Sequence, residues 1–376
     1  MDEDAGVNSR VWLEVHVKAL QENYRKIAAT VAPCEVMSVL KANAYGMGVD
    51  AVSDALIEAG CRYFGVAEIH EALRLAARPG IRVQILGAVF PDEIAAAAAA
   101  DVILPCGDME TARQISAVGV AQGRPVRSHF LVDTGMGRLG VPLPEAEALI
   151  REAVQLPGVI WEGIYSHFPV AYRAGSDYTN AQIAAMRDLM QSLEQTGILF
   201  SWRHIANSDA VNNFSSSYAS PFNLIRAGIN LHGAFDPEGN RLMALDPVIT
   251  LKTRLIAVRE LEAGACVGYG CTYRLPRRMR VGTIPIGYAD GVPMGLSNRG
   301  HVLVHDTACH VLGRISMDYT TVALDVVPDA KCGDEVTCLG GVGPAAITPE
   351  DWATLKGSHA YDILCSVGPR VVRRYV

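Results

Sequence analysis

The stretch EVMSVLKANAYGMGVDAVSDALIEAGCRYFGVAEI, residues 35–69, decides the fold. Its start, EVMSVLK, is largely apolar and β-branched, which is typical of a buried parallel strand. Val52, Leu56 and Ala59 then recur on one helical face, and Gly60 suits the end of that helix. RYFGVAEI predicts a second strand. The stretch is therefore one strand–helix unit followed by the next strand.

This unit repeats along the first two-thirds of the chain. Eight candidate strands begin near residues 35, 62, 83, 101, 127, 159, 202 and 222, with helical patterns between them. Eight such units in roughly 200–250 residues are typical of a TIM barrel. A doubly wound sheet is the alternative, but KANAYGMG stands where its glycine-rich first turn would be. We predict an N-terminal (β/α)8 barrel over residues 9–242.

The pattern changes after Pro247. TIPIGYA, HVLVH, TTVALDVV and DEVTCL predict short strands between turns, and no long helical period follows until about Pro349. The segment before the change, DPEGNRLMALDP, is rich in turn-forming residues and suits a domain boundary. We predict a mostly β C-terminal domain over residues 243–376.

Composition excludes several classes of protein. The chain has 376 residues, of which 50% are hydrophobic and 19% charged, so it can form a packed core. The net charge of −7 argues against nucleic acid as a main partner. The N-terminus MDEDAGVNSR carries no apolar signal segment, and no apolar run would span a bilayer. The nine cysteines include no C-x-x-C pair. We therefore expect reduced thiols, a cytoplasmic protein and no metal site.

Polar residues gather at the predicted strand ends, where a TIM barrel places its catalytic groups. These residues are Lys41, Arg138, His167, Asn207, Ser208 and Arg226. A lysine that follows an apolar strand faces a low-dielectric interior, where burial lowers the pKa of a lysine and favours the nucleophilic amine. The alternative is a lysine that extends into solvent.

The loops after the seventh and eighth strands are the usual phosphate site of this fold. Ser208 offers a hydroxyl there, and Gly228 allows a backbone N–H to approach an anion. A helix cap and a tight turn are the alternative roles of these two residues. With a lysine across the barrel mouth, they predict a phosphorylated aldehyde, pyridoxal phosphate.

The stretch SVLKANAYGMG closely resembles the pyridoxal-phosphate signature of the alanine racemases. Further resemblances follow in order: VDTGMGRLGV, GIYSHF, ANSDA, IRAGI, VGYGCTY, IPIGYADG, GRISMD and the C-terminal YDILCSVGPRVVRRYV. The resemblance covers essentially the whole chain. It implies an isomerase that interconverts L- and D-alanine with pyridoxal 5'-phosphate and supplies D-alanine for the cell wall.

The resemblance also implies a two-base mechanism. Lys41 binds the cofactor covalently and acts as the base on the D-substrate face, while Tyr269 acts on the L face. Because a free tyrosine has a pKa of about 10, this base needs a partner. In the family, the histidine at the position of His167 bonds the tyrosine, and the arginine at Arg226 bonds that histidine and the pyridine nitrogen. An arginine stays protonated, so it does not protonate the ring, and return of the α-proton is favoured.

By the same resemblance, further residues bind the cofactor and the substrate. The phosphate contacts are Tyr45, Ser208, Gly228 and Ile229. Arg138 and the backbone of Met317 hold the substrate carboxylate, and Tyr288 lines the entrance. In the family the β domain closes the barrel of the partner subunit, so the resemblance implies a head-to-tail homodimer.

Three positions depart from the family pattern. Leu131 stands where several relatives have a carbamylated lysine, so Arg138 must be oriented otherwise, by an anion such as chloride or by nearby Asn and Ser side chains. Met294 replaces a usual arginine. Pro369 replaces a tyrosine that in some relatives contacts phosphate and narrows the pocket, so the pocket here is expected to be roomier.

Other functions remain open at this stage. The Pro369 departure favours a serine or broad-spectrum amino-acid racemase of the same fold. A decarboxylase of the same fold uses a cysteine in its β domain, and Cys266 and Cys271 flank the VGYG motif, but Tyr269 argues against it. A non-catalytic pyridoxal-phosphate carrier resembles a single barrel and lacks the residues after Pro247.

Overall fold

The computed structural model describes residues 9–376, and the first eight residues of the acidic N-terminal stretch lie outside the described part. The chain forms two compact units. One, here called the barrel unit, comprises Leu20–Ala44 and Val49–Asp246. The other, the β-rich unit, comprises the described residues up to Ala19, Tyr45–Gly48 and Pro247–Val376. Residues 9–19, assigned to the barrel from the sequence, thus pack with the β-rich unit.

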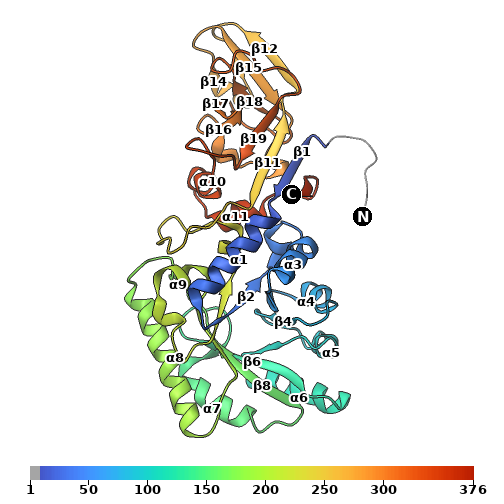
Figure 1. The fold of residues 1–376 in the computed structure, drawn as a ribbon, viewed down its shortest axis with the longest axis vertical. Helices are drawn as coiled ribbons and strands as arrows, with labels where there is room; N and C mark the ends of the chain where they lie inside the picture. Colours follow the sequence, from blue (N-terminus) through green and yellow to red (C-terminus); the bar gives the residue numbers. More distant parts are fainter. Residues whose placement is uncertain (1–8) are drawn as a thin grey trace. The chain divides into compact units, whose positions relative to one another are not determined.

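Eight parallel strands build the barrel unit. Several of them are labelled in Figure 1. The eight strands are β2 (Glu35–Val39), β3 (Tyr63–Val66), β4 (Arg82–Ile85), β5 (Leu104–Cys106), β6 (Val126–Asp133), β8 (Val159–Tyr165), β9 (Trp202–His204) and β10 (Leu224–Ala227). They form two parallel runs, β10-β2-β3-β4 and β5-β6-β8-β9, with the two-residue β7 (Val141–Pro142) paired to β6.

Backbone contacts join the two runs. Gln84 in β4 bridges Ile103 next to β5. On the other side, the N–H of Asn223 donates to the carbonyl oxygen of Arg203 at 3.1 Å, and the N–H of Arg226 donates to that of Ala206 at 3.0 Å. The sheet is therefore closed, and the predicted (β/α)8 barrel is confirmed.

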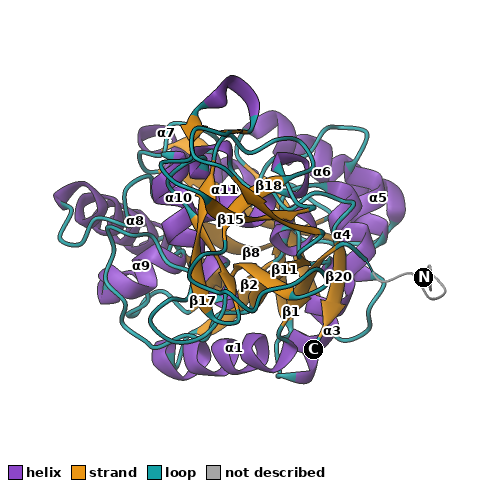
Figure 2. Ribbon diagram, turned by 90° about the horizontal axis from the view of Figure 1, so that it is seen from above, coloured by secondary structure: helices purple, strands orange, loops and turns teal. Residues whose placement is uncertain are grey.

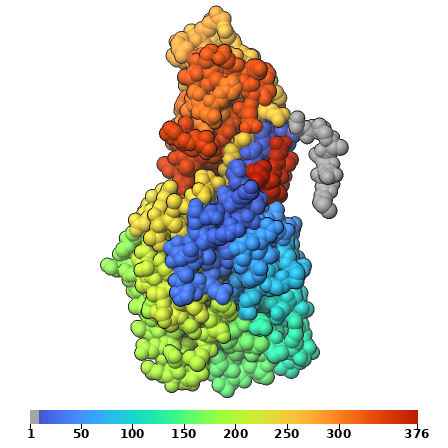
Figure 3. Space-filling model, viewed as in Figure 1, coloured from blue at the N-terminus to red at the C-terminus, as the bar shows by residue number. Residues whose placement is uncertain are grey.

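Helices surround the barrel strands, as Figure 2 shows in purple around β2 and β8. They are α1 (Val17–Val31), α3 (Val49–Glu58), α4 (Ile69–Ala76), α5 (Ile94–Ala99), α6 (Met109–Gln122), α7 (Leu143–Ala153), α8 (Asp177–Gln195) and α9 (Ser208–Asn213). In α1 the buried residues Leu20, Tyr24, Ile27 and Val31 follow the helical spacing of the sequence. Lys26 in α1 forms an ion pair with Asp246 at 2.8 Å. Figure 3 shows the blue part of the surface beside a yellow part.

A left-handed turn follows β2. The short element α2 (Lys41–Tyr45) has Ala42, Asn43 and Ala44 at φ values of 54°, 54° and 55°. L-residues pay about 1–2 kcal/mol each for this conformation, so it must be held from outside. The side-chain oxygen of Asn43 accepts the N–H of Val49 at 2.9 Å, and Glu71 accepts the N–H of Asn43 at 3.1 Å. These contacts fix the segment directly after Lys41.

The β-rich unit contains a nine-stranded sheet in the order β12-β15-β18-β17-β16-β19-β11-β1-β20. Its strands are β1 (Val11–Val15), β11 (Ile249–Arg254), β12 (Ala257–Leu261), β15 (Met279–Ile284), β16 (His301–Val304), β17 (Thr307–Leu312), β18 (Thr320–Ala323), β19 (Glu335–Leu339) and β20 (Val372–Tyr375). The hairpin β13 (Cys266–Val267) and β14 (Tyr273–Arg274) and the helices α10 (Pro349–Lys356) and α11 (Ala360–Cys365) complete the unit. The predicted mostly β C-terminal domain is confirmed.

Strand β1 belongs to this sheet and not to the barrel. Leu13 in β1 pairs antiparallel with Leu251 in β11 and parallel with Arg373 in β20. The strand is almost wholly buried, which requires partners on both edges. Among residues 9–376, no helix is long and apolar enough to cross a membrane.

Candidate active site

The barrel unit brings most of the predicted site residues to one end of its strands. Lys41 follows β2, Arg138 follows β6 and His167 follows β8, while Ser208 begins α9 after β9. Arg226 lies within β10. All five come from the carboxyl ends of parallel strands, and these ends meet at one mouth of a closed barrel.

Arg226 lies at the centre of this group and is buried. Its Nη2 donates to the carbonyl oxygens of Ser166 and Ile205, at 2.7 and 2.9 Å. The same Nη2 lies 3.2 Å from Nδ1 of His167. Burial lowers the pKa of Arg226 to about 10, so the guanidinium stays charged at neutral pH.

His167 is held neutral. Burial, followed by the positive charges of Arg226, Arg138 and Lys41, lowers the pKa of His167 to about 3. A guanidinium has no acceptor, so Nδ1 of His167 must accept from Arg226. Its single proton is therefore assigned to Nε2, which is free to donate away from Arg226. Arg138 and Lys41 lie close enough for their charges to act on this imidazole.

Lys41 differs from the expectation. The sequence predicted a lysine in a low-dielectric interior, and this is wrong, because Lys41 is exposed while the preceding Leu40 is fully buried. The reason is local: β2 ends at Val39, and the left-handed turn begins at once, which places Lys41 on the rim of the barrel rather than inside it.

The segments after β9 and β10 contact each other. Asn207 caps α9 by accepting the N–H of Ala210 at 2.9 Å, so the helix-cap role falls to Asn207. The buried hydroxyl of Ser208 accepts the N–H of Gly228 at 3.0 Å. Ile229, also buried, opens the 3₁₀ turn η2 (Ile229–His232) directly after Gly228.

Arg138 is exposed on a loop that Asp133 organises. The Asp133 carboxylate accepts backbone N–H groups of Gly135, Met136 and Gly137 at 2.9, 2.8 and 3.0 Å. Leu131 is a buried hydrocarbon in β6 and offers this loop no polar contact. The loop is thus fixed through its backbone, by a residue that the sequence analysis did not consider.

Three predicted residues lie in the β-rich unit. Tyr269 projects from η3 (Tyr269–Cys271), the turn of the β13–β14 hairpin, and its side chain is 71% exposed. The preceding Gly268 forms a bridge with Arg314. Tyr288, in η4 (Tyr288–Asp290), and Met317 are also exposed. The region around residues 314–317 therefore connects the segments that carry Tyr269 and Met317.

The loops of Tyr288 and Met317 are joined to each other. The N–H of Tyr288 donates to the carbonyl oxygen of Ser316 at 3.1 Å, and that of Ala289 donates to the carbonyl oxygen of Met317 at 3.2 Å. Gly287 is required at this crossing, because a Cβ there would lie 2.2 Å from the Ser316 oxygen.

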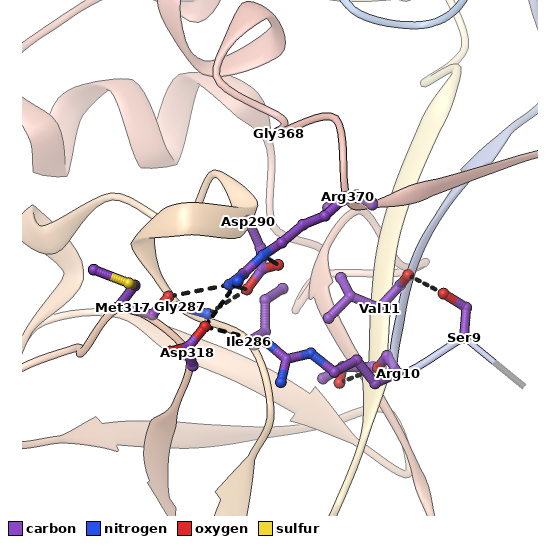
Figure 4. A network of polar contacts seen from close by, with 12 residues as sticks. Ser9, Arg10, Val11, Ile286, Gly287, Asp290, Met317, Asp318, Gly368 and Arg370 are labelled. Carbon is purple, nitrogen blue, oxygen red and sulfur yellow. Dashed lines mark hydrogen bonds and ion pairs between the residues drawn. The ribbon is translucent and has the colours of Figure 1, made fainter.

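An arginine from the C-terminal segment clamps both loops (Figure 4). Arg370 makes two bonds to Asp290, bonds Asp318 through Nη1 at 2.8 Å, and donates to the Met317 carbonyl oxygen at 3.4 Å. Asp290 also accepts the N–H of Gly287 at 2.9 Å. The Arg370 guanidinium thus joins Asp318, which follows Met317, to Asp290, which lies two residues after Tyr288.

Tyr45 groups with the β-rich unit. It is buried, with its ring centroid 6.1 Å from that of Tyr361. Its proposed phosphate contact therefore stays a prediction.

The sequence analysis missed buried polar residues inside the barrel. His204 in β9 contacts Arg226, with 2.7 Å between Nδ1 and Nη1. His129 in β6 and Glu162 in β8 lie farther along the same barrel interior. The signal was present, because strands buried on both faces are usually apolar and each of these residues interrupts one.

Comparisons with known proteins agree over the whole chain. Residues 15–236 match the family model of the alanine racemase N-terminal domain, and residues 248–375 match that of the C-terminal domain. The alanine racemase of Desulforamulus reducens is 37% identical, covering 97% of this chain and 99% of its own length. That of Symbiobacterium thermophilum is 35% identical, covering 97% and 96%.

Solved structures agree as well. The alanine racemase of the D-cycloserine producer Streptomyces lavendulae has a TM-score of 0.90 and 32% identity, covering 98% of each chain. That of Bartonella henselae, which carries covalently bound pyridoxal phosphate, has a TM-score of 0.88 and 30% identity, covering 98% of this chain and 100% of its own.

Proposed function

The chain belongs to the alanine racemase family, and from this we propose that it interconverts L- and D-alanine with pyridoxal 5'-phosphate as cofactor. The observation that carries the proposal is the contact between the buried Arg226 cation and the neutral His167, at a barrel mouth where the charge of Lys41 also acts. This arrangement brings the Arg226 cation, the neutral His167 imidazole and the Lys41 amine to one site.

The residues present fit this cofactor. The Ser208 hydroxyl accepts the N–H of Gly228 and so keeps its own proton to donate to a phosphate, beside the backbone of Ile229. Tyr45 adds a hydroxyl in our proposal. When bound, the cofactor supplies an aldehyde that reacts with amines and a ring that withdraws electrons from the substrate α-carbon.

Arg226 governs what becomes of the α-proton. Its guanidinium faces the ring nitrogen in our proposal and keeps its protons, since a pKa of about 10 lies well above neutral pH. With the cofactor bound, Arg226 would donate a hydrogen bond to the ring nitrogen and would keep its proton. This weakens electron withdrawal and favours return of the α-proton over side reactions.

Two residues move that proton. Lys41 holds the cofactor through its amine and takes or gives the proton on the D face, and Tyr269 does so on the L face. A phenolate needs a donor, and the Nε2 proton assigned to His167 provides one. Arg138 and the backbone at Met317 hold the carboxylate, while Tyr288 lines the entrance.

Tyr269 lies in the β-rich unit and Lys41 in the barrel unit. We propose a head-to-tail homodimer, in which the β-rich unit of one chain supplies Tyr269 to the barrel of the other. We also propose a cytoplasmic location, which suits the nine cysteines, since all of them are free thiols.

The test is exchange of the α-proton with solvent, measured for each enantiomer under initial-rate conditions. Tyr269→Phe should abolish deuterium washout from L-alanine, while D-alanine still exchanges through Lys41. Tyr273→Phe, on the next strand of the hairpin, is the matched control and should retain both reactions. Undiminished washout from L-alanine in Tyr269→Phe would exclude the second-base role.

Lys41→Ala tests the cofactor linkage separately. Borohydride reduction followed by peptide mapping should locate the cofactor on Lys41 in the parent protein and nowhere in the variant. A reducible lysine adduct that survives in Lys41→Ala would move the linkage to another residue.

A further inference from the structure

A continuous line of polar side chains crosses the barrel interior below Arg226. Nη1 of Arg226 lies 2.7 Å from Nδ1 of His204. Nε2 of His204 lies 3.2 Å from Nδ1 of His129, and Nε2 of His129 lies 3.5 Å from Oε1 of Glu162. The four side chains come from β10, β9, β6 and β8. Both imidazoles are fully buried, and Glu162 nearly so.

The direction of every hydrogen bond in this line follows from its first member. A guanidinium only donates, so Nδ1 of His204 accepts and its proton is on Nε2. That Nε2–H can donate only to an unprotonated Nδ1 of His129. The proton of His129 is then on Nε2, which lies 3.5 Å from the Glu162 carboxylate and 3.5 Å from the Tyr63 hydroxyl, whose own proton goes to Gln84. Both imidazoles must be neutral for the line to close.

The electrostatics agree with this assignment. Burial, followed by the charge of Arg226, lowers the pKa of His204 well below its usual value. Burial also lowers the pKa of His129, although the contact with Glu162 opposes this shift. Burial alone would raise the pKa of Glu162, but the hydrogen bond to His129 and the charge of Arg82 lower it to about 2. The line therefore joins a cation to an anion through two neutral rings.

Glu162 is anchored at the other end of the line. Arg82 bonds its Oε1, and Nη1 of Arg127 lies 3.0 Å from its Oε2. The neighbouring Gly163 makes room for the line, because a Cβ there would lie 2.4 Å from Nδ1 and Cε1 of His129. The backbone of β8 is thus adapted to the imidazole beside it.

We propose that Glu162, acting through His129 and His204, is a positioning residue that fixes the orientation and proton arrangement of Arg226. The inference rests on the proposed role of Arg226 at the cofactor ring. Buried hydrogen bonds polarise one another in a low-dielectric interior, so the carboxylate acts on Arg226 without touching it. An apolar core would fill the barrel equally well but would leave the Nη1 side of the guanidinium with only the His204 carbonyl oxygen, at 3.3 Å.

The proton positions can be observed directly. Imidazole 15N resonances in histidine-labelled protein distinguish protonated from unprotonated nitrogens. We expect His204 and His129 each to have a protonated Nε2 and an unprotonated Nδ1 at neutral pH, whether or not the protein is active. A proton on Nδ1 of either ring would overturn the proposal, and this readout is independent of the proposed reaction.

Two substitutions at position 129 separate positioning from packing. His129→Gln can still accept from His204 and donate to Glu162, whereas His129→Leu can do neither. We expect His129→Leu to lower kcat about tenfold with KM for alanine little changed, and to shift the His204 Nε2 resonance, while His129→Gln retains most of kcat. Equal kcat in the two variants, or an unshifted His204 resonance in His129→Leu, would overturn the proposal.

A substitution of Glu162 and a matched control at Arg127 test the carboxylate end of the line. Glu162→Gln removes the charge and should shift the His204 resonance and lower kcat. Arg127→Gln loosens the same ion cluster but leaves Glu162 and His129 in place. It should lower the melting temperature without moving the resonance. A purely structural cluster would make both variants less stable and change the His204 resonance in neither, and an unshifted resonance in Glu162→Gln would therefore overturn the proposal.

Discussion

Arg370 holds the carboxylate of Asp290 with two hydrogen bonds, from Nε to Oδ1 at 2.7 Å and from Nη2 to Oδ2 at 3.0 Å. The Asp290 side chain is 1% exposed, and that of Arg370 is 41% exposed. A guanidinium that reaches from the surface therefore neutralises a buried carboxylate beside Tyr288. The same guanidinium bonds Asp318, the residue after Met317.

Replacing Arg370 should disturb both loops at once. Arg370→Lys keeps the charge but cannot form the two parallel bonds, so we expect KM for alanine to rise about tenfold and the protein to melt several degrees lower. Steady-state kinetics and thermal unfolding measure this. Arg10→Ala is the matched control, because exposed Arg10 contacts Asp318 at 3.4 Å. It should change stability by no more than about 0.5 kcal/mol. Equal effects of the two substitutions would contradict the clamp.

The left-handed turn after Lys41 predicts that an alanine-to-glycine substitution there stabilises the protein, whereas the same substitution in a helix destabilises it. Ala42→Gly should stabilise the protein by about 0.5–1 kcal/mol, since the exposed Ala42 has a φ of 54° and glycine adopts this conformation without strain. Ala29→Gly, at an exposed position within α1, should destabilise it by about 0.5–1 kcal/mol. Denaturant unfolding compares the two. The same sign in both variants would mean that the turn is not strained.

His232 should make stability depend on pH. Burial lowers its pKa from 6.5 to about 4, so between these values the unfolded chain binds a proton that the native chain does not. Stability is therefore lost as the pH falls from 6.5 to about 4, by about 3 kcal/mol for this residue. His232→Leu should remove that part of the pH dependence. Parallel stability–pH curves for the variant and the parent would contradict the assignment.

The substrate range tests the departure at Pro369. By the resemblance, Pro369 stands where a tyrosine narrows the pocket in some relatives, so we expect a roomier pocket that rejects an added hydroxyl weakly, by roughly 10–200-fold. We expect L-serine to be the next substrate after alanine, and Pro369→Tyr to lower kcat/KM for serine more than for alanine. A parent kcat/KM for L-serine more than about 10⁴-fold below that for L-alanine would rule out the roomier pocket.

The fold was predictable where the sequence carries a period. Most of the barrel strands are short, largely apolar runs separated by helices with one apolar face, and both patterns follow from burial. The alternation of Ile249, Leu251 and Thr253, all buried, likewise marked β11 as a strand with one buried face.

The sequence could not show which strands pair with each other or which single polar residues contact each other. The largely apolar segment Val11–Val15 suits a strand, but the sequence does not show which sheet receives it, since its partners in β11 lie more than 230 positions away. His129 and His204 each interrupt a buried strand, but nothing in the sequence shows that the two imidazoles contact each other. The exposure of Lys41 depends on the left-handed backbone angles of residues 42–44, which the sequence Ala-Asn-Ala does not predict.

Because β1 pairs with both β11 and β20, its sheet can be completed only late in the synthesis of the chain. The barrel unit lies within one continuous span of the chain apart from residues 45–48, so it can begin to form while the ribosome is still translating. Strand β1 leaves the ribosome first, yet both of its neighbours in the sheet are made after residue 248. Until residues 372–375 emerge, one edge of β1 has no strand to meet it. The β-rich unit, with the loops of Tyr269, Tyr288 and Met317, is therefore completed last.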